Sequence, residues 1–150
     1  MSLREFLDPA SVDLHLRADS RELALAEMVA LLHLGDRPAA TVVRQLHRRE
    51  MLGSTGFGSG IAIPHCRTLA VTRLRLAFGR HEAGIPWQAM DGRPVHAVFL
   101  IVAPPAEISN QYLPLLGRIA QFVQDPQVPR ILRGLHSVEE FWSLLDQRGV

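Results

Sequence analysis

The stretch Gly53-Ser54-Thr55-Gly56-Phe57-Gly58-Ser59-Gly60-Ile61-Ala62-Ile63-Pro64-His65 joins a loop of glycines and hydroxyl residues to a short apolar strand and a histidine. Glycines let backbone N–H groups turn toward an anion. Pro64 fixes its own φ angle and favours an extended Ile63, so we expect His65 at the rigid end of a strand. A free imidazole, with a pKa of about 6.5, is mostly neutral at pH 7 and can act as a nucleophile. The stretch therefore predicts a histidine that accepts a phosphoryl group.

Phosphoryl transfer also needs donors for the charged equatorial oxygens. The predicted phosphate-binding groups are the hydroxyls of Ser54 and Thr55 and the N–H groups of Gly56 and Gly58. Arg49, at the end of the preceding helix, is the predicted phosphate clamp. All sixteen basic side chains are arginine and none is lysine, so any oxyanion clamp must use the planar guanidinium fork.

Size and composition place residues 1–150 in one domain of an ordinary globular protein. The chain is 47% apolar and 21% charged, and it is long enough to bury a core. A net charge of +1 argues against nucleic acid as a partner. No apolar run approaches the roughly 20 residues of a membrane span, so no membrane insertion is expected. A single cysteine, Cys66, provides no disulfide framework and no zinc site, which makes the cytoplasm the default compartment. We expect neither a metal nor a cofactor.

Strand-like and helix-like segments alternate along the chain. The unbroken apolar run Val95–Val102 predicts a strand in the middle of a sheet, buried on both faces. Further strands are predicted at residues 12–16, 60–63 and 74–79. Helices are predicted from a cap at Asp19 or Ser20 to His33, and at residues 36–51, 109–123, 126–133 and 138–146. This mixture predicts a single α/β domain with helices packed against a mixed sheet.

Two other chemistries were weighed for the glycine loop. Nucleotide binding is disfavoured, because a P-loop needs a lysine and a dinucleotide-binding turn needs a strand before the glycines. Hydrolysis by Ser54 or Ser59 with His65 is also disfavoured, because the sequence lacks a Gly-x-Ser-x-Gly elbow between a strand and a helix.

Residues 49–65, which add Arg49-Glu50-Met51-Leu52 to the opening stretch, resemble the signature of the fructose/mannitol-type enzyme IIA domains of the bacterial phosphotransferase system. The nearest branch is the nitrogen-regulatory enzyme IIA. Similarity continues through residues 85–95, the strand to Val102 and the helices after it. The resemblance implies a mixed, five-stranded sheet flanked by helices. It also implies that His65 receives a phosphoryl group from an HPr-like carrier, at a ring nitrogen that the sequence does not identify, and that a IIB component, a transporter or a sensor kinase is the target.

One position departs from the family pattern. Members of the family have a second histidine near the start of the helix after the apolar strand, and this place falls on Tyr112. A tyrosine can donate a hydrogen bond to a phosphate but cannot carry a positive charge. Two functions therefore stay open: a phosphohistidine carrier with a regulatory role, of the phosphotransferase class, and an interaction module that keeps the fold without transferring phosphate.

Overall fold

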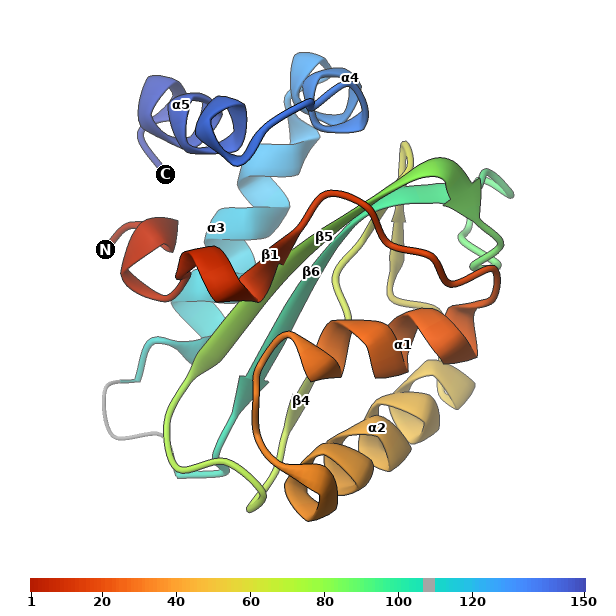
Figure 1. The fold of residues 1–150 in the computed structure, drawn as a ribbon, viewed down its shortest axis with the longest axis vertical. Helices are drawn as coiled ribbons and strands as arrows, with labels where there is room; N and C mark the ends of the chain where they lie inside the picture. The colour runs from red at the N-terminus through yellow and green to blue at the C-terminus, as the bar shows by residue number, and fades with distance from the viewer. Residues whose placement is uncertain (107–109) are drawn as a thin grey trace.

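Strand β6 (Val95–Ala103) lies at the centre of the computed structural model, which describes residues 1–106 and 110–150 (Figure 1). All nine of its residues are buried. It runs antiparallel to β5 (Arg75–Ile85) and parallel to β3 (Ile61–Ala62) and β4 (His65–Arg67). The predicted central strand is therefore confirmed, and so is the mixed character of the sheet.

The described residues form a six-stranded sheet in the order β1-β5-β6-β3-β2, with β4 also paired to β6. At its edges, β1 (Val12–Asp13) lies parallel to β5, and β2 (Gly56–Gly58) lies antiparallel to β3. The sequence did not predict β2 or β4, because glycines and a proline are poor strand signals. The predicted strand at 12–16 is shorter in the structure, and the one at 74–79 extends to Ile85.

Strands β3 and β4 follow one another along the same edge of β6, and both pair with it in parallel. Ile61 and Ala62 pair with Ala97 and Val98, and the pairing resumes in the same register at His65, opposite Ile101. The break falls on Pro64, which has no N–H to donate, although its carbonyl still accepts from the N–H of Ile101 at 3.0 Å. The strand thus continues beyond the predicted end at residue 63, and His65 lies within the sheet.

Helices cover both faces of the sheet (Figure 1). Helices α1 (Arg21–Ala30) and α2 (Asp36–Met51) pack on one face, and α3 (Tyr112–Gln124), α4 (Gln127–Arg133) and α5 (Val138–Arg148) pack on the other. Alternate residues of β6 enter the two apolar clusters between these layers, which is why its sequence is an unbroken apolar run.

The predicted helices are present, with some differences in their ends and faces. Ser20 caps α1, its Oγ accepting from the N–H of Leu23, but the helix ends at Ala30 and not at His33. The helical spacing of apolar residues predicts that Leu23 and Leu113 are buried, but they are 58% and 63% exposed. The neighbouring Leu25 and Leu115 are buried instead. The predicted start of α3 at residue 109 lies outside the described residues. Among the described helices, none is long and apolar enough to cross a bilayer.

Candidate functional site

His65 is the first residue of β4, and its side chain is half-buried. Its Nδ1 lies 2.7 Å from the carbonyl oxygen of Ile63. A carbonyl oxygen only accepts hydrogen bonds, so this contact assigns the hydrogen of the neutral ring to Nδ1. The lone pair then lies on Nε2, which is the nucleophilic atom of the ring. The backbone before His65 thus selects the tautomer as well as the ring orientation.

Tyr112, the first residue of α3, lies beside this ring. The centroids of the two rings are 6.5 Å apart, and the Tyr112 side chain is buried. The guanidinium carbon of Arg67 lies over the Tyr112 ring, 4.5 Å from its centroid. Burial raises the pKa of Tyr112 above its ordinary value, against the opposing charges of Arg67 and Arg49. The phenol is therefore neutral at pH 7 and keeps a hydrogen to donate.

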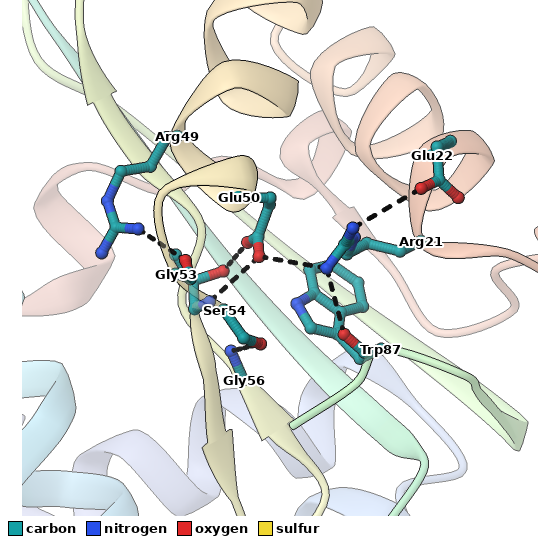
Figure 2. Close-up of polar contacts among 9 residues, drawn as sticks. Arg21, Glu22, Arg49, Glu50, Gly53, Ser54, Gly56 and Trp87 are labelled. Carbon is teal, nitrogen blue, oxygen red and sulfur yellow. Dashed lines mark hydrogen bonds and ion pairs between the residues drawn. The ribbon is translucent and has the colours of Figure 1, made fainter. Parts of the chain in front are cut away.

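Arg49 lies in the last turn of α2, on the other side of the glycine loop from Arg21 (Figure 2). Its Nη1 donates to the carbonyl of Gly53 at 2.7 Å. This contact holds the guanidinium at the C-terminal end of α2. The charge of Arg49 acts on the pKa of Tyr112, so the guanidinium contributes to the positive potential around the two rings. Its role as the phosphate clamp stays a prediction.

The residues of the glycine loop bond mostly to one another and to Glu50. Ser54 Oγ accepts from the N–H of Gly56 at 3.0 Å. A hydroxyl that accepts in this way can still donate its own hydrogen. Both Thr55 donors, the N–H and the hydroxyl, bind the carboxylate of Glu50. The predicted phosphate contacts of Thr55 and Gly56 therefore have protein partners in this structure, and they stay predictions.

Gly58 lies at the far end of the hairpin formed by β2 and β3. A Cβ at this position would be 3.5 Å from Oδ2 of Asp91, whose carboxylate also accepts from the N–H of Ser59 at 2.8 Å. A carboxylate this close disfavours a second anion. The structure thus brings His65, Tyr112 and Arg67 together, but it places Gly58 against a negative charge. A phosphate contact by Gly58 also stays a prediction.

Glu50 is the site residue that the sequence analysis missed. Its position after Arg48 and Arg49 indicates a charged helix end, yet only 4% of it is exposed. One sequence signal could have located it, since Glu50 follows the buried Val42 and Leu46 at intervals of four and so shares their face of α2. Its carboxylate also lies 3.7 Å from Nη1 of Arg21, which donates to the carbonyl of Trp87 at 3.3 Å (Figure 2).

Cys66 follows His65 in β4 but does not add reactive chemistry to the site. Burial raises the pKa of its thiol to about 11, so the thiol is protonated at neutral pH. Among the described residues, no group of three or more histidine, cysteine, aspartate or glutamate side chains lies together as metal ligands would.

A histidine on a mixed sheet, with Tyr112 beside its ring, Arg67 stacked on Tyr112 and a glycine loop bonded to the preceding strand, is the arrangement expected of a phosphohistidine protein. Residues 5–148 match the family described as "Phosphoenolpyruvate-dependent sugar phosphotransferase system, EIIA 2". This chain belongs to that family, which confirms the resemblance found in the sequence.

Nitrogen regulatory proteins are among its relatives. The one from Bradyrhizobium diazoefficiens is 31% identical over 146 residues, which cover 97% of this chain and 95% of the relative. The crystal structure of nitrogen regulatory protein IIA-Ntr from Neisseria meningitidis superposes with a TM-score of 0.84 at 30% identity, covering 94% of this chain and 97% of the other. The fructose-specific EIIABC component of Bacillus subtilis is 31% identical over 98% of this chain, which spans only 23% of that protein's length.

Proposed function

We propose that this protein is a phosphohistidine carrier of a phosphotransferase system, with His65 as the phosphoacceptor. The observation that carries the proposal is the hydrogen bond from His65 Nδ1 to the Ile63 carbonyl. It supports Nε2 as the attacking atom and fixes the ring before the donor arrives, which lowers the entropic cost of reaching an in-line geometry. The ring sits in a strand of the central sheet, so this orientation is held by the fold.

The proposed reaction exchanges one P–N bond for another. The lone pair of Nε2 attacks the phosphorus of a phosphohistidine on an HPr-like donor, and the P–N bond of the donor breaks with its electron pair returning to the donor's ring. His65 then carries the phosphoryl group on Nε2, while the Nδ1–H continues to donate to Ile63. The positive charge that develops on the ring is stabilised by this carbonyl.

The transferred phosphoryl group needs donors and positive charge around it. We assign these to the guanidinium of Arg49, the hydroxyl hydrogen of Ser54 and the phenol of Tyr112. Arg67, stacked on Tyr112, adds a second positive charge. Arginine suits this task because its fork matches two phosphate oxygens at once.

A regulatory role is favoured over sugar transport. Tyr112 stands where the family has a second histidine, and it cannot offer the positive charge that would help onward transfer to a IIB component. Nitrogen regulatory proteins are among the relatives of this chain, which also supports regulation. A IIB component is still a possible partner, since the mannitol enzyme IIA of Escherichia coli, solved in complex with phosphorylated IIB, shares the fold with a TM-score of 0.77. A transporter or a sensor kinase is the alternative target, and the cytoplasm is where such a donor and target would meet the chain.

The test is phosphorylation by enzyme I, an HPr-like protein and phosphoenolpyruvate. We expect an acid-labile, base-stable phosphate on the peptide that contains His65, and none in His65→Ala. His15→Ala is the matched control and should label like the wild type. Labelling that persists in His65→Ala would move the site elsewhere. No labelling of the wild type would favour the second candidate, an interaction module without phosphotransfer, which the Tyr112 replacement supports.

A further inference from the structure

Glu50 is a buried carboxylate at the base of the glycine loop. Its side chain is only 1% exposed, and three donors converge on it: the N–H of Thr55 at 3.0 Å, the hydroxyl of Thr55 and the guanidinium of Arg21 at 3.7 Å. A charged group so far from water is retained only when it is paired and hydrogen-bonded. Here the pairing joins three separate segments: α1, the end of α2 and the loop that leads to β2 (Figure 2).

We propose that Glu50, paired with Arg21, is a positioning residue for phosphoryl transfer at His65. This inference rests on the proposed function and adds to it a residue that does not touch the phosphoryl group. Glu50 acts through the backbone of the loop and through the ring of His65.

The path from Glu50 to the ring is a chain of consecutive hydrogen bonds. The carboxylate fixes Thr55 by both of its donors. The carbonyl of Thr55 accepts from the N–H of Ile63 at 3.0 Å, and the carbonyl of Ile63 accepts from Nδ1 of His65 at 2.7 Å. Each link sets the direction of the next one, so the carboxylate helps to aim the carbonyl that selects the His65 tautomer.

The backbone of Glu50 also contacts the opposite arm of the loop. The backbone carbonyl of Glu50 accepts from the N–H of Gly53 at 3.1 Å, and the carbonyl of Gly53 accepts from Arg49. Ser54 lies between Gly53 and Thr55, so both of its neighbours are held by Glu50. The proposed phosphate donors Arg49 and Ser54 are therefore attached to a loop that Glu50 fixes at two points.

The chemistry of the three donors explains why a carboxylate is needed. A carboxylate is an acceptor at both oxygens, whereas an amide has one oxygen and an NH2 group that would face a donor. Glu50→Gln keeps the shape of the side chain but loses the charge that pairs with Arg21. Its NH2 group either faces the N–H of Thr55 and the guanidinium of Arg21, or it forces the Thr55 hydroxyl to change from donor to acceptor. Arg21 neutralises the carboxylate, so the loop next to the proposed phosphate site gains its anchor without a net negative charge.

The test compares Glu50→Gln with Glu27→Gln. Glu27 is a matched control, because its carboxylate on α1 likewise accepts from the backbone N–H groups of Arg17 and Ala18 but lies in another part of the fold. In Glu50→Gln we expect the turnover rate of His65 phosphorylation to fall about tenfold or more, as misplaced reacting groups do. The KM for the HPr-like donor should stay near the wild-type value, and Glu27→Gln should lose stability only.

A second readout separates positioning from general destabilisation. The 15N chemical shifts of the His65 ring in the unphosphorylated protein report which nitrogen carries the hydrogen. The wild type and Glu27→Gln should show one tautomer with the hydrogen on Nδ1, and Glu50→Gln should move toward the average of two tautomers. This measurement needs no phosphoryl donor, so it tests the inference even when the wild type is not phosphorylated, an outcome that would count against the proposed function instead.

Wild-type turnover and wild-type ring shifts in a folded Glu50→Gln would overturn the inference. If circular dichroism shows that this variant does not fold, Arg21→Gln removes the countercharge from the other side of the carboxylate. That variant should lower the turnover rate and shift the ring signals in the same direction. A folded Arg21→Gln that behaves like the wild type in both measurements would also overturn the inference.

Discussion

The ring of Tyr112 lies 6.5 Å from the ring of His65, and it is covered on one face by the guanidinium of Arg67. A neutral phenol thus stands next to the proposed phosphoacceptor, in the place where the family resemblance predicts a second imidazole. Burial raises the pKa of this phenol, so it stays neutral and donates a hydrogen bond but no charge. Substitutions at Tyr112 can therefore test whether the protein passes its phosphoryl group on to a IIB component.

Tyr112→His should raise the rate at which the phosphoryl group passes on to a IIB component. An imidazole can take up a proton and place a positive charge beside the phosphoryl group, which a phenol cannot do. The measurement is the transfer rate from phosphorylated protein in a quenched-flow assay. Tyr112→Phe serves as the control, since it keeps the ring under Arg67 without the hydroxyl. An unchanged rate in Tyr112→His would remove the argument that this residue limits transfer.

Arg49→Gln should slow phosphorylation of His65 by about 100- to 1,000-fold, because removing one donor from a transition state costs about that much. Its effect on the unfolding temperature should be small, since the guanidinium makes one hydrogen bond to a loop carbonyl. Arg48→Gln is the matched control, an exposed arginine of the same helix turn. Equal rates in the two variants would show that Arg49 does not clamp the phosphate.

Cys66 should react slowly with thiol reagents in the folded protein. Its pKa is raised by burial from an ordinary value of about 9 to about 11, and two pKa units leave about 100-fold less thiolate at pH 8. The rate of modification by a disulfide reagent, compared between folded and urea-unfolded protein, checks this. Equal rates in the two states would contradict the assigned burial.

The same thiol makes the free energy of unfolding depend on pH. Since the thiol of the unfolded chain loses its proton at a lower pH than that of the folded protein, stability should fall as pH rises from about 9 to about 11.

Two glycine substitutions should change stability in opposite directions. A Cβ on Gly79 in β5 would meet the buried side chains of Met28 in α1 and of Leu16, the latter at 2.7 Å, so Gly79→Ala should destabilise the fold by about 1–3 kcal/mol, the usual cost of overpacking. A Cβ on Gly117 in α3 would meet nothing within 4 Å, so Gly117→Ala should stabilise by about 0.5–1 kcal/mol, the helix preference of alanine over glycine. Urea unfolding of both variants is the measurement. Shifts of the same sign would contradict the packing of Gly79 beneath α1.

The sequence predicts the sheet's centre and most of its helices because those segments have strong periodic signals. β6 is identified by its unbroken apolar run, and α2 is identified with both of its ends. β2 and β4 are missed, since residues such as Gly56 and His65 carry no strand preference and become strands only through pairing with β3 and β6. A short stretch of sequence shows only the preference of its own residues, whereas the pairing of β4 with β6 depends on residues far apart in the chain.

The candidate site shows the same division. His65 and Arg49 can be named from residue type and chain position, and Tyr112 can be named from the family resemblance. The role of Glu50 cannot, because its carboxylate is defined by partners 5 and 29 positions away, at Thr55 and Arg21. The hydrogen bond that selects the His65 tautomer is likewise a matter of three-dimensional geometry, although it spans only two residues.

The unbroken register of β3 and β4 along β6 has a consequence for signalling. Because the backbone of His65 is anchored at the middle of the molecule, adding a phosphoryl group to its ring has little freedom to displace the chain. The two states should therefore present nearly identical shapes and differ chiefly in the electric field near the ring. A target that distinguishes them would do so by recognising roughly two added negative charges. It would not need to recognise a change in backbone conformation.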